Sequence, residues 1–232
     1  MNVIGLQTTL PQIVTAIGGL GTASFGLVEA TKAWGGGVSR IGFPRIRATA
    51  TALTPAAGAN NALSQRKIIE TLEANWYNGA DLASQKAIAK TLIKLNLAPD
   101  NAAALAGATG VNAGALTAIA ECVVSGTPLT PAQSDVFGRF DLILTALLDE
   151  TYQRSDQAYR TWTKFWAMIV SIGLALVAAF ILRGLHPAPL EIGEAFLVGL
   201  LATPLAPVAK DLATALTAAV NAMRLVNRGG RE

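Results

Sequence analysis

Charged residues are scarce in this chain, and they are unevenly placed. Only 14% of the 232 residues are Asp, Glu, Lys or Arg, whereas soluble domains carry about 25%. No ionisable side chain occurs before Glu29, and none lies between Lys164 and Arg183. Hydrophobic residues make up 52% of the chain. This composition argues against a water-soluble globular protein and favours an integral membrane protein.

Residues for disulfides, metal sites and common catalytic motifs are also lacking. Cys122 is the only cysteine, so no intrachain disulfide can form, and we expect an inert thiol in an Ala-rich helix. His186 is the only histidine and has no cysteine nearby, which excludes a zinc site or a catalytic pair around it. No phosphate-binding loop, nucleophile elbow or paired-carboxylate motif occurs. We therefore expect no enzyme activity, cofactor, metal or nucleic-acid partner.

Alternating β patterns are absent, while Ala is abundant and helix signals recur. The sequence predicts an all-α fold: an integral membrane protein with about three transmembrane helices and a small cytoplasmic helical domain, joined by a long stem helix. We expect five parts: an N-terminal transmembrane segment (1–34), a basic Gly/Pro linker (35–61), the helical domain and stem (62–160), a transmembrane hairpin with a kinked return helix (161–226) and a basic tail (227–232).

The N-terminal candidate span is the uncharged stretch Leu10–Leu27. As a helix it reaches about 27 Å, close to the ~30 Å hydrocarbon core of a bilayer. The basic region of a secretory signal is missing before it. Small residues at a spacing of four allow close helix packing in lipid, and we expect this role for Gly18, Gly19, Thr22, Ala23 and Gly26. An interfacial helix is the alternative.

The linker is predicted from its glycines and prolines. Gly35–Gly37 interrupt the helix, and Pro44 and Pro55 follow. Basic residues in this stretch are expected to lie against anionic lipid headgroups or a partner; they are Arg40, Arg45 and Arg47.

Four short helices are expected in the helical domain. We expect Asn61 to cap the first, which ends at Asn78 and Gly79, and Ser84 to cap the second. The third is expected from Pro99 to Gly107, and the fourth from Asn112 to Gly126. Three lysines on one face of the second helix are candidate contacts for anionic lipid or an acidic partner, with a solvated face as the alternative; they are Lys86, Lys90 and Lys94.

The stem helix is predicted to enter the membrane without a break. Thr130 and Pro131 form a strong helix start, and no other proline occurs before Leu182. The run Phe165–Leu182 is uncharged and long enough to span a bilayer. Residues at or next to its two ends are expected to anchor it at the headgroups; they are Trp162, Lys164, Trp166 and Arg183.

A turn at Gly184–Pro189 leads to the expected return helix, Leu190–Ala209. Prolines leave carbonyl groups without their helical partners, which neighbouring helices or water must satisfy. The stretch that contains them is therefore our candidate pore or interface; its residues of interest are Thr203, Pro204, Pro207, Lys210 and Asp211. A kinked helix end with interfacial charges is the alternative.

Basic residues gather on one side of this arrangement. They follow the first segment, precede the second and follow the third, so the positive-inside rule places the helical domain and C-terminus in the cytoplasm and the N-terminus outside. Arg outnumbers Lys and Ala is abundant, which suggests a GC-rich bacterial genome. For a membrane protein with cytoplasmic basic segments we therefore expect the bacterial inner membrane.

Function is inferred from this placement. We expect a non-catalytic, homo-oligomeric membrane anchor or adaptor, whose partners are the lipid bilayer, further copies of itself and a cytoplasmic protein assembly. An oligomeric ion channel or pore lined by the kinked third transmembrane helix is one alternative. A membrane-disrupting effector is another.

Overall fold

The computed structural model describes residues 3–55, 63–183 and 191–208. This part of the chain contains helices and no strand, which confirms the predicted all-α class. The described helices, given in chain order with η for 3₁₀ helices, are α1 (Val3–Ala30), η1 (Thr31–Ala33), η2 (Gly37–Ile41), α2 (Phe43–Leu53), α3 (Gln65–Tyr77), α4 (Leu82–Leu95), α5 (Ala102–Thr109), α6 (Ala113–Ser125), α7 (Pro131–Arg183) and the return helix Ile192–Val208.

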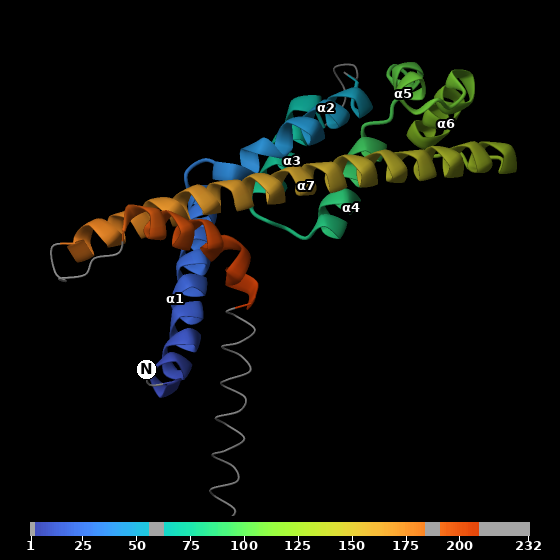
Figure 1. The fold of residues 1–232 in the computed structure, drawn as a ribbon. Coiled ribbons are helices and arrows are strands. Elements are labelled where there is room, and N and C mark those ends of the chain that lie inside the picture. The colour runs from blue at the N-terminus through green and yellow to red at the C-terminus, as the bar shows by residue number, and fades with distance from the viewer. Residues whose placement is uncertain (1–2, 56–62, 184–190, 209–232) are drawn as a thin grey trace, which may run out of the picture. The chain divides into compact units, whose positions relative to one another are not determined.

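The chain divides into two compact units (Figure 1). One comprises residues 39–160 and is called the helical domain below. The other comprises residues 1–38 and 161–232 and is called the apolar unit. The long helix α7 contributes its first part to the helical domain and its last part to the apolar unit. Its predicted continuity from Pro131 is confirmed.

Two predicted helix starts are wrong by a few residues. The Ser64 side chain caps α3 by accepting from the N–H of Lys67, whereas Asn61 lies outside the described residues. Asp81 caps α4, and the expected cap, Ser84, supplies the N–H that Asp81 accepts. In each helix the capping side chain accepts a hydrogen bond from the N–H three residues later, as N-caps commonly do. The prediction that a polar residue caps each helix is therefore right, but the residue chosen is wrong.

Helix α5 also differs from its prediction. It runs from Ala102 to Thr109, and Gly110, with φ of 68°, ends it. Pro99 precedes the helix in a turn that Asn101 holds, since its side chain bonds the N–H of Ala98 and the carbonyl of Asn96. The fourth helix is confirmed, with Asn112 as its N-cap and Gly126 at its end.

The expected linker contains a helix that belongs to the core of the domain. Four residues of α2 at spacings of three and four are buried, namely Phe43, Ile46, Ala50 and Leu53. Pro44 stands in the first turn of α2, where a missing N–H costs no helical hydrogen bond. The prediction of a linker from this proline is wrong, because the proline marks a helix start.

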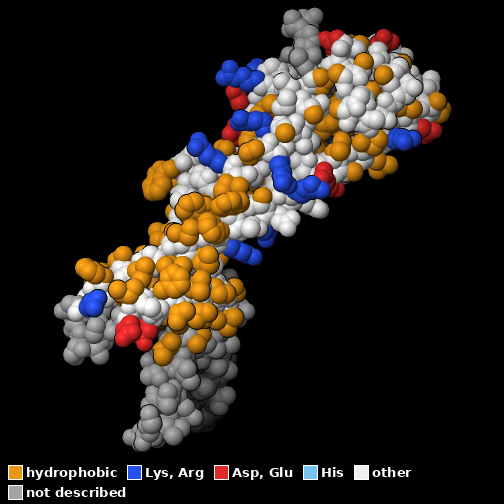
Figure 2. Space-filling view, turned by 45° about the horizontal axis from the view of Figure 1, so that its top comes forward, with side chains coloured by type: hydrophobic (Ala, Val, Ile, Leu, Met, Phe, Trp, Pro, Cys, Tyr) orange, Lys and Arg blue, Asp and Glu red, His pale blue; other side chains and the backbone are white. Residues whose placement is uncertain are grey.

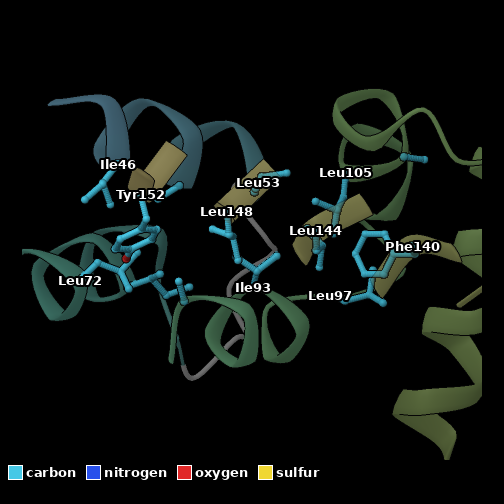
Figure 3. Packing of buried hydrophobic residues seen from close by; sticks show 14 of the residues in the cluster. Ile46, Leu53, Leu72, Ile93, Leu97, Leu105, Phe140, Leu144, Leu148 and Tyr152 are labelled. Atoms are coloured by element: carbon cyan, nitrogen blue, oxygen red, sulfur yellow. The ribbon is translucent and has the colours of Figure 1, made fainter. Parts of the chain in front are cut away.

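Large side chains of α7 form the centre of the helical domain. Phe140, Leu144, Leu148 and Tyr152 recur every fourth residue and are almost fully buried. Side chains from the surrounding helices pack against them (Figure 3), among them Ile46, Leu53, Leu72, Ile93 and Leu105. The domain therefore folds around one helix, which completes the core of the short helices.

Buried positions continue along α7 beyond the domain, but their side chains become small. In the apolar unit the buried residues of α7 are Thr163, Ala167, Ser171, Ala175 and Ala179, again every fourth residue. In the helical domain, the large side chains at this spacing pack against side chains of the neighbouring helices. Small ones allow another helix backbone to approach closely.

Gly42, the residue before α2, provides a test of packing in the domain. Its φ of −79° suits any residue, but a methyl group there would lie 2.5 Å from the Trp76 ring and 2.9 Å from the Ser155 carbonyl oxygen. We expect Gly42→Ala to lower the free energy of unfolding by about 1–3 kcal/mol. Denaturation of the full chain in mild detergent, monitored by tryptophan fluorescence, measures this change.

The matched control is Gly138→Ala in α7, where an added methyl group meets nothing within 4 Å. Alanine favours a helix over glycine by about 1 kcal/mol, so this variant should be as stable as the parent or more so. Equal stability of the two variants would contradict the close approach at Gly42.

Candidate functional site

The helices of the apolar unit meet through small residues. A methyl group at Gly21 of α1 would overlap the carbonyl oxygen of Ala202 in the return helix. One at Gly199 would lie 2.5 Å from the Cα atom of Ile172 in α7. The other buried positions of the return helix are alanines, namely Ala195, Ala202 and Ala206. The return helix thus packs backbone to backbone against both α1 and α7.

Large apolar side chains lie on the outside of the same unit. Phe180 is 80% exposed, and hydrophobic side chains gather over this part of the molecule with few charges among them (Figure 2). Further exposed members of this surface are Ile169, Val177, Ile181, Ile192, Phe196, Leu197 and Leu201. Small residues inside and large apolar residues outside reverse the pattern of the helical domain.

Aromatic residues lie where the apolar stretches begin or end. Trp162, Phe165 and Trp166 are each 43% exposed, and their rings meet edge to face in sequence, with centroids 5.5 and 6.1 Å apart. The predicted anchors Lys164 and Arg183 are also exposed. Trp34 stands directly after the apolar stretch Ile13–Ala33 and is 82% exposed, a position that the sequence analysis overlooked although the same signal marks it.

The predicted small-residue face of α1 has few contacts with the described part of the chain. Gly18 is buried, but Gly19, Thr22, Ala23 and Gly26 are exposed, and a methyl group at Gly19 or Gly26 meets nothing within 4 Å. The face that packs inside the unit contains Gly21 and Ser24 instead. Packing of the predicted face against another chain stays a prediction.

Proline residues of the predicted kink lie in the last turns of the return helix, which bends there (Figure 1). Pro204 and Pro207 are exposed. The Thr203 hydroxyl is buried and, like that of Ser171, makes no hydrogen bond within the described part of the chain. The other two residues of this candidate site, Lys210 and Asp211, lie outside the described residues.

The row of lysines on α4 binds acidic residues of α7. Lys86 pairs with Asp149 at 2.5 Å. Lys90 and Lys94 both pair with Asp141, at 2.6 and 2.7 Å. These partners are far away in the sequence, so a helical face read by itself does not reveal them. Within the chain the row holds α4 to the stem, and its contact with lipid or a partner stays a prediction.

The three predicted arginines differ in their surroundings. Arg45 is exposed on α2. Arg40 and Arg47 line an open groove that Glu73 and Tyr77 of α3 complete. Arg47 pairs with Glu73 at 3.1 Å. The sequence marked these residues as a basic segment but did not reveal that α3 adds an acid and a phenol to them.

The described residues contain no group of three or more His, Cys, Asp or Glu side chains that could hold a metal ion. No family model matches the chain, and no curated protein or solved structure does either. Functional inference therefore rests on the surfaces and contacts described above.

Asp141 tests the attachment of α4 to α7. Hydrogen bonds from Lys90, and then from Lys94, lower the pKa of Asp141. We expect Asp141→Asn to lower the free energy of unfolding by about 1–2 kcal/mol at pH 7. Because the folded pKa is depressed, this contribution is complete above about pH 4 and is lost as the pH falls through the folded value. Denaturation of both proteins across this pH range should show their stabilities converging in acid.

Asp135→Asn, at an exposed position of the same helix, is the control with the same change of charge. A loss in this variant equal to that of Asp141→Asn would mean that net charge, and not the lysine contacts, accounts for the effect.

Gly199 tests the close packing of the apolar unit. Gly199→Ala inserts a methyl group against the backbone of Ile172, and we expect it to cost about 1–3 kcal/mol. Gly193→Ala, in the same helix, meets nothing within 4 Å and should cost nothing. Thermal denaturation in detergent compares the two, and indistinguishable midpoints would argue against backbone contact at Gly199.

Proposed function

We propose that this chain is a non-catalytic integral membrane protein that anchors a helical domain at the cytoplasmic face of the inner membrane. The inverted packing of the apolar unit carries the proposal: small residues fill its inside and large apolar side chains cover its outside. The helical domain of the same chain has the opposite arrangement. Two solvents, lipid and water, account for both.

The energetic argument supports lipid around the apolar unit. A large aliphatic or aromatic side chain left in water forgoes about 1.5–3 kcal/mol relative to burial, and the exposed surface around Phe180 contains many of them. In lipid this cost vanishes, and helix association depends on close packing of small residues. Two helices of the described chain are long and apolar enough to cross a membrane, with the stretches Ile13–Ala33 and Pro131–Ile181.

The return helix supplies the third crossing of the proposed layout. Its described part, Ile192–Val208, is apolar but shorter than the other two. Its close contacts with α1 at Gly21 and with α7 at Ile172 support a place beside them in the same environment. Basic residues that follow the uncharged run Leu10–Leu27 or precede the run Phe165–Leu182, such as Lys32 and Lys164, support the inward orientation of the helical domain.

The proposed anchor or adaptor associates with further copies of itself. The exposed small-residue face of α1, with Gly19, Ala23 and Gly26, suits close packing against the same face of a second copy. The unbroken α7 connects this membrane part to the domain that would bind a cytoplasmic partner.

An oligomeric channel is the second candidate. It is favoured by the buried hydroxyls of Ser171 and Thr203, which make no hydrogen bond within the described residues. Polar groups inside an apolar unit are costly unless water or a further helix satisfies them. Purified oligomer in planar bilayers separates the two functions, since an anchor leaves the bilayer silent and a channel conducts.

The single cysteine tests the proposed layout. Cys122 is half-buried on α6 of the helical domain. A membrane-impermeant maleimide should label it in inverted inner-membrane vesicles and leave it unlabelled in intact spheroplasts. The protein should also stay in the membrane pellet after alkaline carbonate extraction.

A double variant serves as a control in case the half-buried Cys122 reacts slowly. Cys122→Ser combined with Ser125→Cys moves the thiol to an exposed position of the same helix. Labelling of either protein in intact spheroplasts would reverse the orientation, and release by carbonate would refute membrane insertion.

A further inference from the structure

An open groove lies on the helical domain where η2, α2 and α3 meet. Its volume is about 600 Å³, and its walls include Arg40, Phe43, Arg47, Glu73 and Tyr77. Two guanidinium groups therefore face one carboxylate, so the groove has an excess of positive charge. An anion would be drawn to it.

The carboxylate of Glu73 is engaged on both oxygens. Its Oε2 atom accepts a hydrogen bond from Nη2 of Arg47 at 3.1 Å, and its Oε1 atom accepts one from the Tyr77 hydroxyl at 3.0 Å. Burial and this hydrogen bond raise the pKa of Tyr77, so the phenol stays protonated and keeps donating. These contacts offset the negative charge of Glu73 and leave Arg40 as the excess cation.

Arg47 is held in place while much of it stays accessible. Its guanidinium carbon lies 5.3 Å from the centroid of the Phe43 ring, and its side chain is 55% exposed. A guanidinium has five N–H donors in one plane, and its contact with Glu73 uses Nη2. A planar donor group fixed in this way suits the paired oxygens of a phosphate.

One residue of the groove, Arg40, follows a candidate membrane span closely in the sequence. Only six residues separate Ala33, the last residue of that span, from Arg40. Exposed Trp34 directly follows the span. If the span crosses the bilayer, Arg40 follows shortly after the level of the headgroups, where lipid phosphates lie.

We propose that this groove binds the phosphate group of an anionic phospholipid, with Arg40 and Arg47 as donors. The inference rests on the proposed membrane function and gives its basic segment a specific ligand in place of diffuse attraction to a charged surface. Soluble phosphate offers the same donors the same oxygens, so the test compares both sources.

The test uses the full chain in detergent, mixed with phosphatidylglycerol or phosphatidylcholine of matched acyl chains, and native mass spectrometry to measure bound lipid. We expect a preference for phosphatidylglycerol that falls about fivefold in Arg40→Gln and in Arg47→Gln. Arg66→Gln is the matched control, because Arg66 is exposed on α3, pairs with Glu70 and does not line the groove. It should leave the preference unchanged.

Glu73→Gln separates a binding site from a structural contact. It removes the acidic group of the groove and releases Arg47, so binding of phosphatidylglycerol should increase. A purely structural role for the Arg47–Glu73 pair predicts a loss instead, and misfolding cannot produce a gain. A loss in this variant would therefore overturn the proposal.

Three other results would also overturn it: equal binding of the two lipids, an equal loss in Arg66→Gln, or complete displacement of phosphatidylglycerol by millimolar inorganic phosphate. The measurement in detergent is independent of orientation in a membrane. A retained lipid preference with Cys122 labelled from outside would thus refute the proposed layout alone, while a lost preference with Cys122 inside would refute the groove alone.

Discussion

The packing of α7 is the interaction on which the rest of the structure depends. Buried residues recur at helical spacing along its length in both units, and their size changes, from Phe140 and Leu144 in the domain to Ala167 and Ala175 beyond it. Large residues gather the short helices α2–α6 into a core that none of them forms alone. Small residues bring the return helix against the α7 backbone at Ile172. One helix thus organises two kinds of packing.

Charge is distributed according to the same division. Acidic residues of α7 within the domain, Asp141 and Asp149, hold the lysines of α4. Beyond Lys164 the helix has no charge until Arg183, and its exposed surface becomes apolar. In the helical domain, three ion pairs fix the position of α4 on α7 in addition to the apolar packing. In the apolar unit, close contact between helix backbones fixes the helices instead.

Local signals predicted α6 well, because a capping residue, a helical stripe and a terminating glycine agree there. They also predicted α7 well, because Thr130 and Pro131 mark its start and no proline interrupts it. They failed at α2, where Pro44 indicated a linker but stands in the first turn of a helix. Contacts between segments that are distant in the sequence could not be predicted from local signals. Lys90 meets Asp141, and Gly21 meets Ala202, only because the fold brings them together. The small residues of α1 were recognised, but choosing Gly21 over Gly19 requires knowing where the return helix lies.

The apolar unit is discontinuous in the chain, and this determines the order in which it can assemble during synthesis. The helical domain is contained in residues 39–160 and can fold once they have left the ribosome, whereas the apolar unit combines residues 1–38 with residues from 161 onward. The contact between Gly21 and Ala202 can therefore form only after the return helix has been synthesised, which is later than α1 and α7. During that interval Gly21 lacks the contact with the return helix that it makes in the finished protein, and a neighbouring copy or a chaperone can reach this face of α1.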